Sequence, residues 1–348
     1  MTDRISPLST PAATRAVLEA HGLATKKSLG QNFLVNDDVL RKILELSEVG
    51  ADDVVLEVGP GIGTLTIPLL KEARAVVSVE RDRDLPTVLR GTCGPWAERF
   101  SLVEKDAVDL TEEDVRAALA CPIAARAAGE GEEGAPGAPQ AAASECAPAP
   151  DSLPLPNKFV ANLPYAVAAT VVLGYFQDFP WIDSATVMVQ AEVADRMCAQ
   201  PGSKNYGAYT VKLSLCAQVT GRFEVPPRCF MPAPHVDSAV IRLDRLTMET
   251  ASNVGGARVP DDQPKGTVPF GGDSGVGIAA VCRVVDAAFA QRRKTIRNSM
   301  SANGFDKQAL DAAFEACGIA PTSRAETLSV SDFVCLAEAL AAVEADGR

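Results

Sequence analysis

The sequence predicts an α/β fold in which helices cover both faces of a mainly parallel sheet, with a small helical domain at the C-terminus. Short apolar runs that suit buried strands alternate with helical segments, the first run ends at a glycine cluster, and only helical patterns follow residue 277. Hydrophobic residues make up 47% of the 348 residues, which is enough to build a sizeable core.

Five buried strands are expected, at residues 54–58, 75–79, 100–103, 159–161 and 185–189. A helix that begins near residue 36 precedes the first strand, and a helix at 65–72 connects the first strand to the second. The C-terminal helices are predicted at residues 278–300, 307–317 and 331–343. Buried strands separated by helices in this way are typical of a parallel sheet.

Two segments rich in Ala, Gly and Pro interrupt this pattern, at residues 121–157 and 249–277. Because such compositions bury too little apolar surface to offset the entropy of ordering, the first is interpreted as a flexible insertion and the second as a loop. The predicted organisation is an α/β domain over residues 1–248 that carries the insertion, and a helical domain over residues 278–348.

The formal net charge of −12 argues against a nucleic-acid partner, but the charges are unevenly distributed. Residues 121–157 contain five Asp or Glu and one Arg, whereas residues 283–298 contain five Lys or Arg and one Asp. Electrostatic screening acts over about 8 Å at physiological salt, so a phosphate backbone would respond to such a local basic segment. The composition therefore does not exclude nucleic acid.

The nine cysteines form no CxxC pair and lie near no histidine, which indicates reduced thiols rather than disulfides or a zinc site. No metal is expected. No apolar stretch is long enough to cross a membrane, and residues 1–23 lack the pattern of a secretory signal. We therefore expect a cytoplasmic protein without membrane partners.

The first predicted strand runs into the sequence EVGPGIG at residues 57–63. Glycines such as Gly59 and Gly61 let the backbone turn sharply and approach a ligand closely at the carboxyl end of a strand. The G-x-G-x-G spacing differs from the G-x-G-x-x-G pattern of dinucleotide sites. It resembles motif I of class I methyltransferases, which implies a Rossmann-like methyltransferase sheet and S-adenosylmethionine as cosubstrate.

Acidic residues follow the next two predicted strands. Glu80 ends the second strand, where its carboxylate could accept hydrogen bonds from ribose hydroxyls. Asp106 follows the third strand and could accept from the adenine amino group of the cofactor. A solvated surface acid is the alternative for each residue alone. Three features in this order after three successive strands favour the cofactor site.

The fourth predicted strand ends in Asn162-Leu163-Pro164-Tyr165. This tetrapeptide resembles the [D/N/S]-P-P-[Y/F/W] signature of methyltransferases that act on exocyclic or amide nitrogens, where an aromatic amine is a poor nucleophile because its lone pair is delocalised. The side-chain oxygen of Asn162 and the backbone carbonyl of Leu163 could hold both N6 hydrogens of an adenine and aim its lone pair at the sulfonium methyl. Pro164 would stiffen the segment, and Tyr165 would stack on the base with about 1–3 kcal/mol. A plain strand end followed by a turn is the alternative.

Three more segments resemble the small-subunit ribosomal RNA adenine N6,N6-dimethyltransferases (the KsgA/RsmA type). In KKSLGQNFL, residues 26–34, the resemblance implies that Asn32 and Leu34 contact S-adenosylmethionine, as does Asn162. In FMPAPHVDS, residues 230–238, Phe230 could close the other face of the target adenine; a buried aromatic that anchors a hairpin is the alternative.

The third segment is FAQRRKTIRN, residues 289–298. In a continuous helix, Arg292, Arg293 and Lys294 would span most of a turn, and Arg297 would share a face with the last two. Such a cluster suits phosphate contacts, and a solvated helix surface is the alternative. The C-terminal domain is therefore expected to bind RNA.

The resemblance covers about residues 20–120 and 158–340. It implies S-adenosylmethionine-dependent dimethylation of two adjacent adenines near the 3′ end of small-subunit (16S) rRNA, by a monomer that acts on pre-30S particles and has residues 1–248 as its catalytic domain.

Three other functions remain open. An adenine N6-methyltransferase of large-subunit rRNA that confers antibiotic resistance shares N-[L/I]-P-[Y/F], although residues 26–34 and 289–298 favour the small-subunit family. A ribosome-assembly factor with dispensable catalysis would use the basic segment. An NAD oxidoreductase would require G-x-G-x-x-G, which this glycine spacing does not supply.

Overall fold

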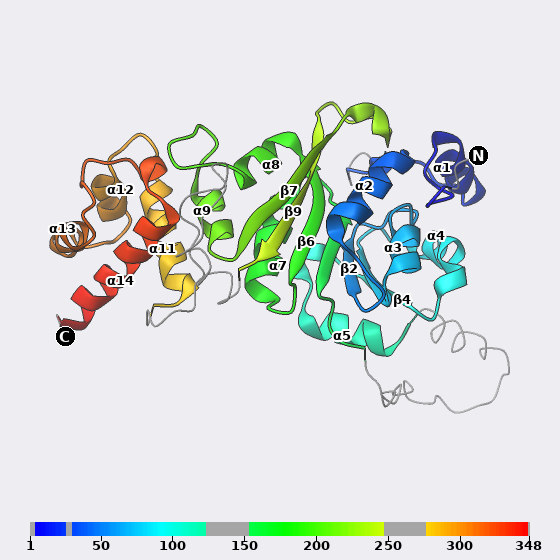
Figure 1. Ribbon diagram of the computed structural model, residues 1–348, viewed down its shortest axis with the longest axis horizontal. Helices are drawn as coiled ribbons and strands as arrows, with labels where there is room; N and C mark the ends of the chain where they lie inside the picture. Colours follow the sequence, from blue (N-terminus) through cyan, green and yellow to red (C-terminus); the bar gives the residue numbers. More distant parts are fainter. Residues whose placement is uncertain (1–3, 26–29, 123–152, 247–275, 347–348) are drawn as a thin grey trace. The chain divides into compact units, whose positions relative to one another are not determined.

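The computed structural model describes residues 4–25, 30–122, 153–246 and 276–346 (Figure 1). The chain divides into two compact units: unit 1 contains Met1–Ala191 and Thr220–Leu243, and unit 2 contains Glu192–Val219 and Asp244–Arg348. The segment Glu192–Val219, which the sequence assigned to the α/β domain, is thus grouped with the C-terminal helices. Most of the predicted insertion, residues 123–152, and most of the predicted loop, residues 249–275, lie outside the described residues.

The elements up to the sixth strand belong to unit 1. They are α1 (Pro11–Ala20), β1 (Phe33–Leu34), α2 (Asp37–Ser47), β2 (Val54–Val58), α3 (Thr66–Glu72), β3 (Ala75–Glu80), α4 (Leu85–Thr92), η2 (Gly94–Trp96), β4 (Phe100–Glu104), η3 (Ala107–Asp109), α5 (Glu112–Ala120), β5 (Lys158–Asn162), α7 (Ala168–Asp178) and β6 (Ser184–Gln190). The five strands predicted from the apolar runs are β2 to β6, each confirmed to within two residues.

The elements after β6 lie in both units. They are α8 (Ala191–Met197), α9 (Ala208–Ser214), β7 (Ala217–Val225), η5 (Pro227–Cys229), β8 (Phe230–Met231), β9 (Ser238–Arg245), α11 (Ile278–Phe289), α12 (Ile296–Ala302), α13 (Lys307–Ala316), η6 (Ala325–Thr327) and α14 (Val330–Asp346). None of the helices in the described part of the chain is long and apolar enough to cross a membrane.

Seven strands form one sheet in the order β4-β3-β2-β5-β6-β9-β7. Neighbours from β4 to β6 pair in parallel, as the alternation of strands and helices predicted. The strand β2 is buried along its whole length, and its neighbours are β3 on one side and β5 on the other. The strand order therefore reverses beside β2, and in open α/β sheets ligands bind at the carboxyl ends of the strands at such a point.

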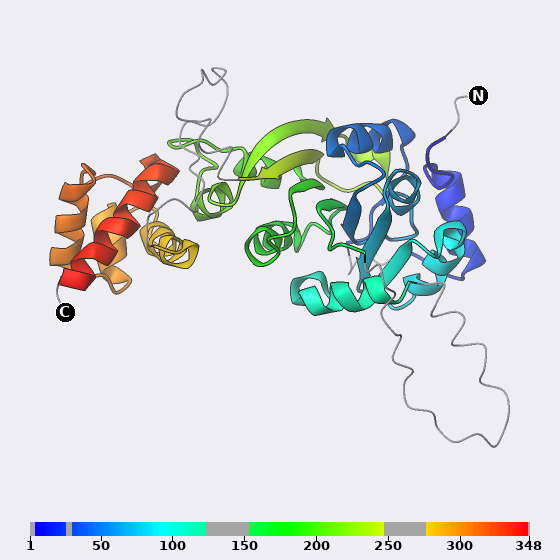
Figure 2. The same cartoon turned by 60° about the horizontal axis from the view of Figure 1, so that its bottom comes forward.

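Helices cover both faces of this sheet. Figure 2 shows α2 and α3 on one side, and α5 and α7 on the other. On the α7 side, the ring of Tyr175 packs 5.1 Å from that of Phe159 in β5. On the α2 side, Leu40, Ile43 and Leu70 belong to one core cluster with Val55 of β2. Burial of the apolar face of each helix against the sheet fixes the strand ends that carry the site.

The basic segment of unit 2 departs from the prediction. The expected continuous helix over 278–300 is wrong, because α11 ends at Phe289 and α12 begins at Ile296. Thr295 caps α12 by accepting from the backbone N–H of Asn298, and Ser299 Oγ accepts from Gln291 N at 3.1 Å. These side chains replace the missing helical hydrogen bonds, so the chain turns without a glycine or proline to mark the break.

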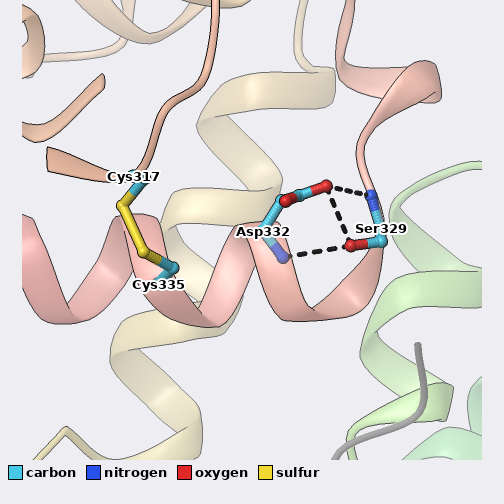
Figure 3. Close-up of a disulfide and its surroundings, with 4 residues drawn as sticks. All are labelled: Cys317, Ser329, Asp332 and Cys335. Atoms are coloured by element: carbon cyan, nitrogen blue, oxygen red, sulfur yellow. Dashed lines mark hydrogen bonds between the residues drawn. A yellow bond between two sulfur atoms is a disulfide. The ribbon is translucent and has the colours of Figure 1, made fainter. Parts of the chain in front are cut away.

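The cysteine prediction is also wrong for one pair, because Cys317 and Cys335 form a disulfide with Cα atoms 6.0 Å apart (Figure 3). Cys317 caps the end of α13 and Cys335 lies in α14, whose start is fixed by reciprocal hydrogen bonds between Ser329 and Asp332. Packing of the two helices brings together residues 18 apart in the sequence, a spacing that matches no disulfide motif. The six other cysteines within the described residues take part in no disulfide.

Candidate cofactor and target-base site

A cavity of about 550 Å³ lies in unit 1 at the carboxyl ends of the parallel strands. Its walls include the residues that follow β2, β3, β4 and β5, which places it at the reversal of strand order. All seven residues predicted to contact the cofactor line it, namely Asn32, Leu34, Gly59, Gly61, Glu80, Asp106 and Asn162. The remainder of the tetrapeptide, Leu163, Pro164 and Tyr165, lines the same cavity.

The glycine loop that follows β2 lines the cavity. Gly59 and Gly61 have φ values of 69° and 61°, a region that favours glycine. Gly59 N donates to the carbonyl of Val79 at 3.0 Å, which ties the loop to β3. A Cβ on Gly61 would lie 3.0 Å from the ring of Phe33. The loop therefore needs glycine at residue 61 both for its backbone angle and for its contact with β1.

Glu57 is buried beneath this loop and ties three elements together. Its Oε2 accepts hydrogen bonds from Thr66 Oγ1 of α3 at 2.8 Å and from Ser78 Oγ of β3 at 2.7 Å. Burial raises the pKa of Glu57 to about 7, although the two hydrogen bonds favour the charged form. The sequence showed this acid two places before Gly59 but gave it no role.

Glu80, at the end of β3, presents its carboxylate to the cavity. Its Oε1 accepts from Asp82 N at 2.8 Å, and its Oε2 accepts from Gly61 N at 3.4 Å. Glu80 is 8% exposed, and burial raises its pKa to about 7. A carboxylate has acceptor capacity beyond these two bonds, so donors from a ligand would stabilise its ionised form.

Asp106 follows β4 and is held in two ways. Its side chain caps η3 by accepting from Val108 N at 3.2 Å, and its Oδ2 lies 3.0 Å from Nη1 of Arg81. The carboxylate thus stays near the cavity with a cation beside it, at the end of the strand that neighbours β3.

Asn162 is the last residue of β5 and pairs with Met188 in β6. Its Nδ2 donates to the backbone carbonyl of Asn32 at 3.3 Å, so the oxygen of the same amide is the atom that can accept from a ligand. Leu163 N donates to the Met188 carbonyl at 3.1 Å, which extends the strand pairing by one residue. The next carbonyl, that of Pro164, accepts from Val167 N and Ala168 N at the start of α7.

Tyr165 is fixed by a residue of β9, which lies two strands from β5 in the sheet. Its hydroxyl lies 2.6 Å from Oγ of Ser238, which is fully buried in β9. Partial burial raises the pKa of Tyr165, so the phenol stays neutral at ordinary pH. The hydrogen bond leaves the ring half-buried at the cavity wall, where a flat ligand can stack on it.

The segments that contain Leu34 and Phe230 lie side by side as the short antiparallel pair β1–β8, with Leu34 opposite Phe230 and Phe33 opposite Met231. Leu34 is 2% exposed and lines the cavity. Phe230 is 5% exposed, belongs to the core cluster and is not among the described residues that line the cavity. Its position matches the buried-anchor alternative, and stacking by Phe230 stays a prediction.

The four residues predicted to bind RNA lie in unit 2 and are not equivalent. Arg292, Arg293 and Lys294 are exposed in the turn between α11 and α12. Arg297, in α12, donates two hydrogen bonds to the carboxylate of Asp311, at 2.5 and 2.6 Å. These bonds raise the pKa of Arg297 and lower that of Asp311. The Asp311 carboxylate thus occupies one edge of the Arg297 guanidinium. The sequence did not indicate this ion pair.

Several cavity residues were missed by sequence reasoning. Gln31, beside Asn32, donates to Asp82 Oδ2 at 2.7 Å, and Gln190 ends β6. The position of Gln190 at a strand end is a signal that could have found it, because the first four strands had each supplied a polar or glycine residue there. Ser238 gave no such signal, because its role depends on β9 lying beside β6. Within the described ranges, no group of three or more His, Cys, Asp or Glu residues could hold a metal ion.

Comparison with known proteins agrees with this geometry. A family model described as ribosomal RNA adenine dimethylase matches residues 22–254. The ribosomal RNA small subunit methyltransferase A of Streptomyces griseus is 36% identical over 332 residues, covering 94% of each chain. The enzyme of the same name from Corynebacterium diphtheriae is 34% identical over 338 residues, covering 96% of each.

Solved structures support the fold. A dimethyladenosine transferase from Plasmodium falciparum aligns with a TM-score of 0.60 and 21% identity, covering 87% of this chain and 95% of that one. The 23S rRNA methyltransferase ErmE aligns with a TM-score of 0.55 and 23% identity, covering 89% of this chain and all of the other. The chain belongs to the ribosomal RNA adenine dimethylase family and is an S-adenosylmethionine-dependent rRNA methyltransferase.

Proposed function

We propose that this protein dimethylates N6 of two adjacent adenines near the 3′ end of small-subunit (16S) rRNA, acting as a cytoplasmic monomer on pre-30S particles. The observation that carries the proposal is the meeting of Asn162-Leu163-Pro164-Tyr165 with the glycine loop and Glu80 in one cavity. Relatives named for the small subunit, at 34–36% identity, favour that subunit over the large one. The likeness to ErmE supports the shared fold alone.

The cavity residues fit S-adenosylmethionine, which supplies an electrophilic sulfonium methyl when bound. In this proposal Glu80 accepts hydrogen bonds from the ribose hydroxyls, and Asp106 accepts from the adenine amino group. Gly59 and Gly61 allow the close approach of the methionine part, and Asn32, Leu34 and Asn162 line the same wall. The family implies this cosubstrate, and the donor set needs no metal.

The target adenine is held by acceptors and by stacking. The side-chain oxygen of Asn162 accepts one N6 hydrogen, because its amide nitrogen is engaged with Asn32. The carbonyl of Leu163 accepts the other, since that of Pro164 is occupied by the first turn of α7. Tyr165, held by Ser238, stacks on the base. The methylated amine is acidic enough to lose its proton to water, so no strong general base is required.

RNA binding by unit 2 completes the proposal. Arg292, Arg293 and Lys294 are exposed and consecutive, and they contact phosphates of the rRNA. An adenine in a single-stranded or loop segment is the target, because N6 must leave its base pair before it can be methylated.

The test is transfer of tritiated methyl from S-adenosylmethionine to 30S subunits from cells that lack this activity. We expect label in N6,N6-dimethyladenosine near the rRNA 3′ end. Asn162→Ala should lower the rate by about a hundredfold or more, because one of two acceptors that orient the nucleophile is lost. It should weaken cofactor binding by only about fivefold, the worth of one hydrogen bond.

Asn303→Ala, at the end of α12, is the matched control and should retain full activity. Label on large-subunit rRNA instead of 30S would move the protein to the antibiotic-resistance methyltransferases. An Asn162→Ala variant that loses methyl transfer but restores 30S maturation in cells would favour the assembly-factor role.

A further inference from the structure

A second cavity, of about 450 Å³, lies entirely within unit 2. We call it the unit 2 pocket. Its walls come from α8, the loop at residues 202–205, the turn after α11, and η6. Apart from a glycine, every residue that lines it is polar or charged, with three cations, Arg196, Lys204 and Arg292, and two carboxylates, Glu192 and Glu326. In a chain with a net charge of −12, this is a local excess of positive charge.

The walls of the unit 2 pocket are held by buried contacts. Tyr206 is 2% exposed, and its hydroxyl donates to the Leu328 carbonyl at 2.8 Å. Gly202 N donates to the Glu326 carbonyl at 2.6 Å, so one end of the loop is attached to η6 and the other to the residue that follows it. Thr210 Oγ1 of α9 donates to the Arg196 carbonyl at 2.8 Å. The loop therefore presents Lys204 from a fixed frame.

The cations are oriented but not neutralised as a group. Arg196 is hydrogen-bonded to Glu192 one turn away in α8. Arg292 Nη2 donates to the carbonyls of Lys204 and Tyr206, at 3.3 and 3.4 Å, which anchors one end of the guanidinium and leaves its other donors for a ligand. Lys204 is exposed. Three cations on separate elements that face one pocket suit a phosphate group.

Glu326, which lines the pocket with a side chain that is 21% exposed, carries an acceptor in need of a donor. Oε2 of Glu326 is buried and has no hydrogen-bond partner among the described residues. The other oxygen, Oε1, lies 3.8 Å from Nη1 of Arg324. A buried acceptor without a partner is unfavourable, so a turn of the carboxylate that presents this oxygen to a hydroxyl donor in the pocket gains more than the hydrogen bond alone.

We propose that the unit 2 pocket binds one nucleotide of an RNA strand, with the phosphate at Arg196, Lys204 and Arg292 and the ribose 2′-hydroxyl donating to Glu326 Oε2. A cationic group beside an unpartnered carboxylate oxygen matches a ribonucleotide, because its phosphate is an anion and its 2′-hydroxyl is a hydrogen-bond donor. DNA lacks this hydroxyl. The inference rests on the proposed function in taking RNA as the partner, and it adds Arg196, Lys204 and Glu326 to the residues that hold it.

The phosphate contact is tested with the full-length protein and a fluorescent single-stranded oligoribonucleotide, by anisotropy over a range of salt concentrations. Lys204→Ala should weaken binding several-fold and reduce the slope of log K against log salt by about 0.7, the value for one phosphate contact on a single strand. Lys307→Ala removes an exposed lysine elsewhere in unit 2 and should leave the slope unchanged. An unchanged slope in Lys204→Ala would overturn the phosphate assignment.

The ribose contact is tested with the same strand and its 2′-deoxy counterpart. The wild type should prefer RNA, and Glu326→Ala should reduce the RNA-to-DNA affinity ratio about tenfold, the worth of a hydrogen bond to a charged group. Removing a negative charge strengthens binding of both strands alike, so the ratio isolates the hydroxyl. Glu315→Ala, an exposed residue of α13, is the matched control. A ratio that does not change in Glu326→Ala overturns the ribose assignment.

Both assays omit S-adenosylmethionine, which separates this inference from the proposed function. Normal methyl transfer by the wild type together with unaltered RNA binding by the pocket variants would reject the pocket alone. Loss of RNA discrimination in the pocket variants together with no methyl transfer to 30S would reject the proposed substrate and keep the pocket. Melting temperatures of the pocket variants that match those of the control variants establish that the pocket variants are folded.

Discussion

The two cavities of this protein hold their polar groups by different means. In the cofactor cavity, the residues Glu57 and Glu80 are 1% and 8% exposed, and strand ends and a glycine loop position them. In the unit 2 pocket, Arg196 is 51% exposed and its position depends on an ion pair and on a loop attached to η6. The first cavity therefore raises the pKa values of two of its carboxyl groups, whereas the second gathers exposed positive charge.

Because of this difference in burial, the two sites should tolerate substitutions differently. A buried site in a close-packed frame has no room for an added atom, while an exposed pocket can accept one with only local backbone strain. Solution conditions should separate them too, with pH acting on the first and salt acting on the second.

The largest contrast is expected between two glycines that both have positive φ. Gly61→Ala places a Cβ 3.0 Å from the ring of Phe33 at a φ of 61°. The combined strain and overpacking should lower the free energy of unfolding by about 2–4 kcal/mol and weaken S-adenosylmethionine binding by more than about tenfold. Calorimetric titration and thermal melting measure the two effects.

Gly202→Ala is the matched variant in the unit 2 pocket. Gly202 has a φ of 82°, but a Cβ there meets nothing within 4 Å. Strain of about 1–2 kcal/mol is expected, with cofactor affinity unchanged. Equal loss of cofactor affinity in both variants would contradict the separation of the two sites.

The pH dependence should sharpen the comparison. Burial raises the pKa of Glu80 from 4.5 to about 7, so the folded protein retains a proton that the unfolded chain loses. Stability of the ligand-free protein should fall as pH rises between these two values and should then level off, and Glu57 adds to the same trend. Thermal melting across this window measures the effect.

Cofactor binding should have the opposite sign. Ribose hydroxyls donate to the ionised form of Glu80, so affinity for S-adenosylmethionine should rise about tenfold between about pH 6 and about pH 8. Glu80→Gln should bind more weakly and show a flat profile. A profile in Glu80→Gln that still rises by the wild-type factor would show that another group carries the effect.

The smallest effect concerns the basic segment of unit 2. Arg293→Ala removes an exposed cation and should change the salt slope of RNA binding by about 0.7. Arg297→Ala should change the slope by less than half of that, because Asp311 already occupies one edge of the Arg297 guanidinium. Asp311→Asn should release Arg297 and strengthen RNA binding about twofold to threefold. Equal slopes in the two arginine variants would show that RNA displaces Asp311.

Much of the fold could be predicted because its elements are buried on periodic patterns. Residues 54–58 form a strand both in the prediction and in the structure. A run of apolar residues is buried, and this run is too short for a buried helix. The helix over 278–300 was wrong because the break at residues 290–295 is made by Thr295 and Ser299, and either residue is also common within or beside helices. Local propensity is a weak guide where side-chain hydrogen bonds compete with the backbone.

The disulfide and the ion pair of Arg297 were unpredictable for a related reason. Cys317 and Cys335 lie 18 residues apart, and Arg297 and Asp311 lie 14 apart. Each pair meets because two helices pack, and no motif in the sequence between the partners indicates that packing. The hydrogen bond between Tyr165 and Ser238 spans 73 residues and depends on the position of β9 in the sheet.

The pattern of apolar runs was enough to predict the mainly parallel sheet, the order of its strands along the chain, and the residues that end them. Those residues converge because parallel strands share one carboxyl edge, so the sequence was enough to assign Gly59, Glu80 and Asn162 to a single site. Packing alone settles which cations are paired, which tyrosine is fixed, and that Oε2 of Glu326 has no donor among the described residues. Those properties depend on distances between side chains far apart in the sequence, and such distances exist only after the elements have packed.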